Sequence, residues 1–84
     1  MRSLLLRSEQ IKAARSLLGW TQAELAKRAD VGEMTIKRIE ARAGTIGGTV
    51  DTALRVQRAL EKAGIEFIGA PGEGPGVRLW SKAK

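Results

Sequence analysis

The chain has 84 residues, no cysteine and no histidine, and 15 Lys and Arg against 9 Asp and Glu give it a net charge of +6. This length fits one small domain, and the missing residue types exclude disulfides, thiolate nucleophiles, imidazole bases and the usual zinc sites. The positive charge favours a polyanion as partner, although a solvated basic surface alone would give the same composition.

The first helix is expected over residues 9–18, because apolar side chains recur there at helical spacing. Ser8 is the expected N-cap, Glu9 follows in the first turn where the helix dipole favours negative charge, and Gly19 supplies the stop. The apolar residues 4–6 either extend this helix or form an extended arm. They are too few for a signal peptide or a membrane span, so we expect a soluble, cytoplasmic protein without a membrane partner.

A second, short helix is expected over residues 22–29, because Thr21 and Glu24 form a capping box just before its apolar positions. A tight break follows at residues 30–32. It contains Asp and Gly, two residue types that tolerate a left-handed backbone. A third helix is then expected over residues 33–41.

Three glycines in residues 42–49 predict a loop, after which a fourth helix is expected over residues 50–63. The pattern then changes to alternation in residues 65–68 and 77–80, on either side of a stretch rich in glycine and proline. This pattern predicts two strands in a hairpin. Because a lone hairpin is marginally stable in water, it should pack on the helices or on a second copy of itself.

Two short helices joined by a tight break, the second one basic on its exposed side, form a helix-turn-helix arrangement. The run TQAELAKRADVGEMTIKRIE resembles the helix-turn-helix of the Cro and phage-repressor-like (XRE-type) transcription regulators. The matching residues are Thr21, Gln22, Leu25, Ala26, Val31, Thr35, Ile36, Arg38, Ile39 and Glu40. The resemblance covers about residues 8–63, and the tail is similar to the ending of small bacterial regulators of this class.

The expected fold is therefore mainly α: a compact four-helix, lambda-repressor-like domain over residues 1–64 and a C-terminal β-hairpin over residues 65–84. In such a domain Leu25 belongs to the core shared by the two helices of the motif. The resemblance also implies a buried ion pair between Arg15 and Glu40, which we expect to be structural and not a DNA contact.

Two positions depart from the family pattern. Asp30 stands where the family favours Gly, and Gly32 stands where it favours Ser or Thr as the cap of the third helix. We expect this exchange to soften the turn slightly without removing the motif.

In the helix-turn-helix geometry the start of the third helix enters the major groove. The residues expected to contact bases are Glu33, Met34, Lys37 and Arg38. Arg38 suits guanine, and Met34 suits a thymine methyl group. Glu33 has two interpretations: it accepts a hydrogen bond from a cytosine amino group, or it stabilises the helix dipole. For Lys37 and Arg38 the alternative is a solvated basic face.

Phosphate contacts are expected from Gln22, Thr35, Arg42 and Thr45. For Thr35 the alternative is packing against the turn. Gln22 begins the second helix, where its amide can donate to a phosphate with help from the helix dipole. Arg42 and Thr45 lie in the glycine-containing loop, for which the alternative is an ordinary linker.

The leading hypothesis is a sequence-specific, double-stranded DNA-binding transcription regulator, such as a repressor, that acts as a homodimer. Two-fold pairing would place both recognition helices in grooves about one turn apart, ~34 Å. The hairpin is the candidate dimer contact because exposed strand edges invite pairing; the alternative is that it folds back on its own helices. Trp80 could cover the hairpin or an interface.

A second hypothesis is an antitoxin-type interaction module, which binds a toxin through its tail and DNA through its helices. A third class, an enzyme, lacks a catalytic constellation in this sequence. We therefore expect no catalytic residues, no cofactor and no metal.

Overall fold

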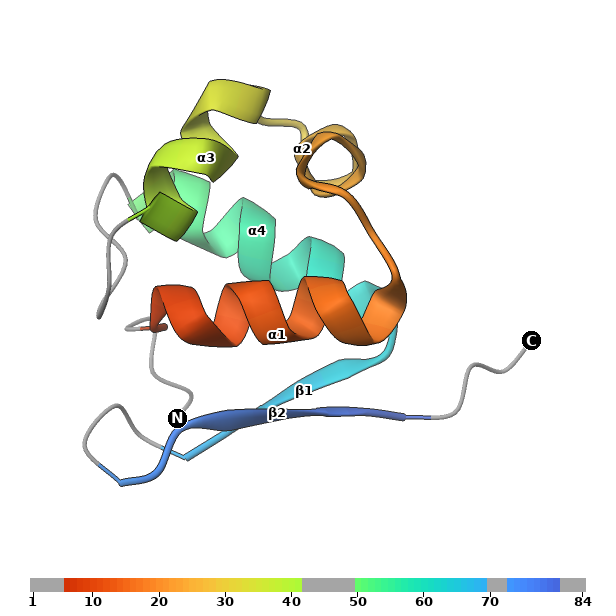
Figure 1. The fold of residues 1–84 in the computed structure, drawn as a ribbon, viewed down its shortest axis with the longest axis vertical. Helices are drawn as coiled ribbons and strands as arrows, with labels where there is room; N and C mark the ends of the chain where they lie inside the picture. Colours follow the sequence, from red (N-terminus) through yellow and green to blue (C-terminus); the bar gives the residue numbers. More distant parts are fainter. Residues whose placement is uncertain (1–5, 42–49, 70–72, 81–84) are drawn as a thin grey trace.

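The computed structural model describes residues 6–41, 50–69 and 73–80. Four helices precede two strands in these ranges (Figure 1): α1 (Ser8–Leu18), α2 (Gln22–Ala29), α3 (Glu33–Ala41), α4 (Val50–Lys62), β1 (Ile65–Ile68) and β2 (Gly76–Leu79). The predicted fold class, mainly α with a C-terminal hairpin, is confirmed. None of the described helices combines the length and the apolar character that a membrane span requires.

The start of α1 differs from the prediction. Arg7 takes the cap position with an extended backbone, and Ser8 is the first helical residue and is fully buried. The prediction of Ser8 as N-cap is therefore wrong. Gln10 makes the capping contact instead, because its side-chain oxygen accepts from the backbone N–H of Arg7 at 2.9 Å. The Nε2 group of Gln10 also donates to the carbonyl of Gly76 at 3.0 Å, so one side chain caps α1 and ties it to β2.

The ends of α1 and α2 both use a left-handed residue, at the predicted stop of α1 and in the predicted break after α2. Gly19 has φ 71° and Asp30 has φ 58°. At the end of α2 this conformation lets the N–H of Val31 donate to the carbonyl of Ala26 at 3.0 Å, which satisfies a carbonyl in the last helical turn. The chain therefore turns within three residues between α2 and α3.

The core lies between the helices and the inward side of the hairpin. Its buried apolar members are Leu6, Ile11, Ala14, Leu25, Ala26, Ala29, Ile36, Ile39, Val56, Leu60 and Ile65. Leu25, which was expected in the core of the motif, is fully buried. Because Ile65 of β1 belongs to the same cluster, the hairpin and the helices share one core.

The hairpin packs on its own helices. Its strands are antiparallel, with Ile65 opposite Leu79 and Phe67 opposite Val77, and all four side chains pack into or against the core. Figure 1 shows the hairpin alongside α1, where β2 contacts α1 and β1 contacts α4. The helices of the same chain therefore cover one face of the hairpin. Folding back on its own helices was the predicted alternative to pairing with a second copy.

The outward side of the hairpin carries Glu66, Arg78 and Trp80. Arg78 Nη1 lies 3.3 Å from Glu66 Oε1 on the opposite strand, and the indole N–H of Trp80 donates to the same oxygen at 2.9 Å. The guanidinium of Arg78 lies 5.4 Å from the centre of the Trp80 ring. Trp80 thus contacts the hairpin, yet it stays 56% exposed.

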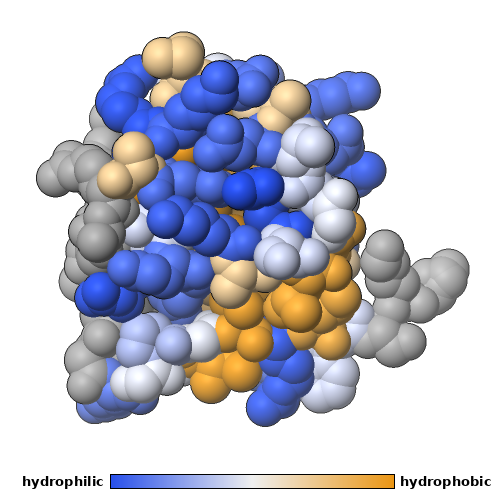
Figure 2. All heavy atoms as spheres, viewed as in Figure 1, coloured by the Kyte–Doolittle hydropathy of each residue, from blue (hydrophilic) through white to orange (hydrophobic). Residues whose placement is uncertain are grey.

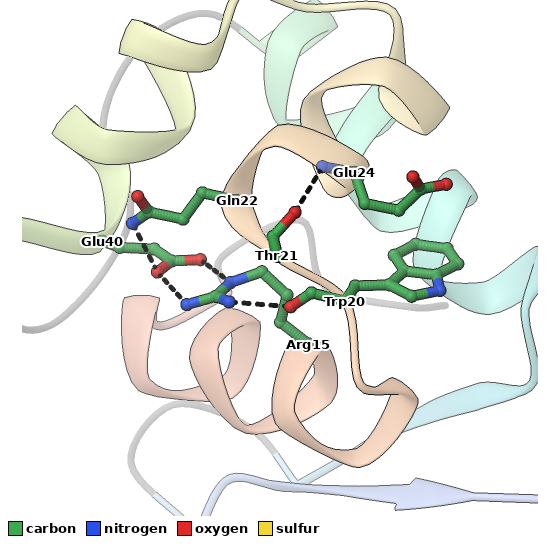
Figure 3. Close-up of polar contacts among 6 residues, drawn as sticks. All are labelled: Arg15, Trp20, Thr21, Gln22, Glu24 and Glu40. Atoms are coloured by element: carbon green, nitrogen blue, oxygen red, sulfur yellow. Dashed lines mark hydrogen bonds and ion pairs between the residues drawn. The ribbon is translucent and has the colours of Figure 1, made fainter.

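An ion pair joins α1 to α3, and a hydrogen bond from α2 adds to it (Figure 3). Arg15 of α1 donates from Nε and Nη2 to the two carboxylate oxygens of Glu40 on α3, each at 2.8 Å. Gln22 of α2 donates from Nε2 to Glu40 Oε1 at 3.0 Å, and Arg15 Nη1 donates to the carbonyl of Trp20 at 2.8 Å. We call these four residues the Glu40 cluster; it connects three helices through one carboxylate.

The Glu40 carboxylate is ionised in this cluster. Its side chain is only 4% exposed. Burial alone raises the pKa of Glu40, but the hydrogen bonds from Arg15 and then from Gln22 outweigh burial, so the pKa lies below its ordinary value. The hydrogen bond with Glu40 likewise raises the pKa of Arg15. The cluster therefore stabilises the fold in its charged form.

The low pKa of Glu40 predicts acid sensitivity. A carboxylate whose pKa is lower in the folded than in the unfolded state stabilises the fold fully above the unfolded value, about 4.3, and this contribution is lost as pH falls through the folded value. At pH 7, Glu40→Gln should lower the free energy of unfolding by about 2–4 kcal/mol, because Arg15 loses its charged partner. The difference between wild type and Glu40→Gln should shrink as pH falls below about 4.

Urea denaturation of both proteins from pH 7 to pH 3 measures this difference. Glu33→Gln changes an exposed carboxylate of the same helix and is the matched control; at pH 7 it should stay within about 0.5 kcal/mol of wild type. An undiminished difference between wild type and Glu40→Gln at pH 3 would contradict the assignment.

Candidate nucleic-acid interface

Helix α3 has a buried side and an exposed side. Its buried side chains are those of Ile36, Ile39 and Glu40. The four residues predicted to contact bases lie together on the exposed side, at positions one turn apart: Glu33, Met34, Lys37 and Arg38. Figure 1 shows α3 at the edge of the molecule, on the far side of α1 from the hairpin. The buried side thus fixes which way the exposed side faces.

The charges on the exposed side of α3 are not equivalent. Glu33 Oε2 lies 3.8 Å from Lys37 Nζ, one turn later, and both side chains are about half exposed (48% and 52%). Such a pair is weak and is screened by salt. Arg38 makes no hydrogen bond or ion pair with residues 6–41, 50–69 or 73–80. Within these ranges its planar fork of donors has no protein acceptor, and such a fork suits bidentate acceptors.

Met34 is the most apolar group on this side of α3. Its side chain is 66% exposed at the first turn of the helix. The side chain of Met is apolar and flexible, so it packs more favourably against another apolar group, such as a methyl, than against water. The exposed side of α3 therefore offers Met34 in its first turn and the basic side chains of Lys37 and Arg38 one turn later.

The predicted phosphate contact at Gln22 has a partner inside the protein. Its Nε2 group donates one N–H to Glu40, as described above. A side-chain amide carries two N–H donors, and the bond to Glu40 uses one of them. The sequence did not reveal this inward contact, because Gln22 and Glu40 are 18 positions apart and meet only when α2 packs on α3.

The start of α2 is held by a second set of contacts. The hydroxyl of Thr21 accepts from the backbone N–H of Glu24 at 3.0 Å, which is one half of the predicted capping box (Figure 3). The carboxylate of Glu24 pairs instead with Arg28 Nε at 2.6 Å. This hydrogen bond lowers the pKa of Glu24. Arg28 also lies over the ring of Trp20, 4.8 Å from its centre, so the residue before the cap is fixed as well.

The other predicted phosphate contacts fall in different places. Thr35 lies in the first turn of α3 and is half-buried, and its backbone N–H donates to the carbonyl of Gly32 at 3.0 Å. Gly32 thus takes the cap position without a side-chain acceptor. Arg42 and Thr45 lie outside the described residues, as does the predicted loop over residues 42–49.

The residues that the structure describes contain no group of three His, Cys, Asp or Glu side chains close enough to hold a metal ion. The exposed side of α3 carries hydrogen-bond donors and one apolar group, and its opposite side packs into the core.

Comparison with known proteins agrees with this geometry. The model of the helix-turn-helix family HTH_3 matches residues 11–63, a range that contains α1, α2, α3 and α4 except for the first residues of α1. No curated protein matches the chain. The matched range covers more than half of the 84 residues and includes the exposed side of α3 and the Glu40 cluster. The chain therefore belongs to the helix-turn-helix family of Cro and phage-repressor-like (XRE-type) DNA-binding regulators.

Proposed function

We propose that this protein is a sequence-specific regulator of transcription that binds double-stranded DNA as a homodimer and inserts α3 into the major groove. The observation that carries the proposal is the exposed side of α3, where Met34, Lys37 and Arg38 project from a helix whose other side is buried. An α-helix fits the major groove of B-DNA, where base edges differ for every base pair. The net charge of +6 supports attraction to the phosphate backbone. We propose that it acts in the cytoplasm, as the resemblance to small bacterial regulators implies.

The side chains of α3 have different proposed roles. Arg38 has a free guanidinium within the described part of the chain, so we assign it bidentate pairing with guanine. Met34 contacts a thymine methyl. Glu33 faces Lys37 at 3.8 Å and lies in the first turn of α3, so its charge has two stabilising partners on its own helix. We therefore assign Glu33 to the helix and not to a cytosine.

Phosphate contacts frame this surface in the proposal. In the proposal Gln22 contacts a phosphate through its second N–H, and Thr35, Arg42 and Thr45 contribute further donors. Such contacts fix the position of the domain on the duplex without reading the base sequence.

Arg38→Ala should remove base discrimination at one position. Losing a bidentate pair with guanine costs about 1–3 kcal/mol at that base and little elsewhere. Binding to a selected duplex and to its single-base variants, measured at one salt concentration, gives the discrimination at each position. The matched control is Arg58→Ala, which removes the same charge from an exposed position on α4. If Arg38→Ala and Arg58→Ala weaken all duplexes alike, Arg38 does not read a base.

The homodimer contact in this proposal is the outward side of the hairpin. Glu66 and Arg78 lie opposite each other there, so a second copy related by a two-fold axis could exchange these partners. Trp80 supplies an exposed aromatic group beside them. Figure 2 also shows apolar side chains gathered over α1 and β2, in contrast to the hydrophilic surface over α2 and α3; Leu17 of α1 is 48% exposed.

Trp80→Ala should shift the protein from dimer to monomer. Buried aromatic groups dominate many interfaces, and truncating one commonly costs about 2 kcal/mol or more, or roughly 30-fold in the dissociation constant. Sedimentation equilibrium over a range of concentrations measures this constant. Met34→Ala, which removes an exposed apolar side chain from α3, should leave it unchanged. A wild-type protein that stays monomeric would contradict the homodimer and would favour the antitoxin-type alternative, in which the tail binds a different protein.

A further inference from the structure

Arg55 of α4 reaches across to the turn between α2 and α3. Its Nη1 group donates to the backbone carbonyl of Asp30 at 3.0 Å and lies 3.1 Å from the carboxylate oxygen Oδ2 of the same residue. Its Nε group donates to Oδ2 of Asp51, one turn earlier on α4, at 3.0 Å. One guanidinium thus binds a main-chain oxygen of the turn and two carboxylates.

The turn held by Arg55 sets the start of α3. Only residues 30–32 connect α2 to α3, and the carbonyl of Gly32 accepts from the first turn of α3. Helix α4 packs on α2, so its position relative to α2 is set by the core. A bond from Arg55 to the Asp30 carbonyl therefore ties the turn to a helix that lies outside the motif itself.

The conformation of Asp30 supports a specific role for its side chain. A left-handed backbone is easiest for glycine, and Asp30 adopts it with φ 58°. The Asp carboxylate lets this position form an ion pair with Arg55 that glycine cannot form. The Asp30 side chain is 94% exposed, so the ion pair alone is weak and is screened by salt. The additional bond to the main-chain carbonyl makes the contact directional.

Direct binding of Arg55 to a DNA phosphate is disfavoured by its surroundings. Two carboxylates, those of Asp30 and Asp51, lie within 3.1 Å of its nitrogen atoms. They accept from two of its N–H groups and place two negative charges where a phosphate would approach. Its contribution to DNA binding must then come through the turn.

We propose that Arg55 is a positioning residue for DNA recognition: it fixes the Asp30 turn, and through it the direction in which α3 enters the groove. The inference rests on the proposed function, sequence-specific DNA binding. It assigns a role in base discrimination to a residue that touches no base. Loss of Arg55 lets α3 adopt a range of entry angles, which weakens binding to the selected site more than binding to unselected DNA.

DNA binding of four proteins tests the role in recognition: wild type, Arg55→Ala, Arg55→Lys and the matched control Arg58→Ala. Each is measured at one salt concentration on a selected duplex and on a duplex of scrambled sequence. Arg55→Ala should lower the ratio of the two affinities about two- to five-fold, while Arg58→Ala should change both affinities equally. Arg55→Lys keeps the charge but not the fork, so it should not restore the ratio. Full rescue by Lys, or equal effects of Arg55→Ala and Arg58→Ala, would overturn the proposal.

Amide hydrogen exchange tests the hold on the turn without DNA. The N–H of Val31, which bonds to the Ala26 carbonyl, should exchange about two- to five-fold faster in Arg55→Ala than in wild type, and at the wild-type rate in Arg58→Ala. An unchanged rate in Arg55→Ala would overturn the proposal. Failure of the wild-type protein to discriminate the two duplexes would contradict sequence-specific binding instead. The exchange rates would still decide whether Arg55 holds the turn.

Discussion

The Glu40 carboxylate is the constraint on which the helix-turn-helix depends. An ionised group at 4% exposure is tolerated only when charged and polar donors surround it. Those donors come from Arg15 on α1 and Gln22 on α2, so the three helices must meet at one geometry for the charge to be satisfied. Apolar burial is compatible with many arrangements of small helices, whereas few arrangements satisfy the hydrogen bonds of this carboxylate. We infer that the cluster selects one arrangement.

This constraint also sets the rotation of α3, and with it the direction of the candidate DNA-binding surface. Glu40, Ile36 and Ile39 all point inward, so the opposite side, with Met34 and Arg38, must face outward. The Glu40 cluster acts near the end of α3, while the turn at its start is held from α4 by Arg55. The two ends of α3 are therefore positioned by different helices and by different polar contacts.

The sequence predicted the elements whose signals are local. The bounds of α2 and α3 follow from helical periodicity and from Thr21, and the left-handed turn follows from Asp30. The Ser8 cap failed because a general preference for Ser was overridden by tertiary contacts: Ser8 is buried, while Gln10 caps the helix and reaches Gly76, 66 positions away. Such a long-range contact leaves no local pattern.

The same limit applies to the candidate site. Helical spacing placed Arg38 and its neighbours on one side of α3, and the family resemblance paired Arg15 with Glu40, as the structure has them. The sequence did not reveal that Gln22 joins this pair or that Arg55 binds the turn, because both contacts depend on how the helices cross. Alternation in the hairpin predicted two faces, but the helices that cover one of them are known only from the fold.

In the proposed function, two copies of α3 read one specific DNA sequence. Selection of binding sites from a library of random duplexes tests this reading. We expect enrichment of a two-fold symmetric site whose half-sites contain guanine and are centred about 10 base pairs, or ~34 Å, apart. A protein that binds every duplex alike, with no base enriched at any position, would contradict sequence-specific recognition by α3.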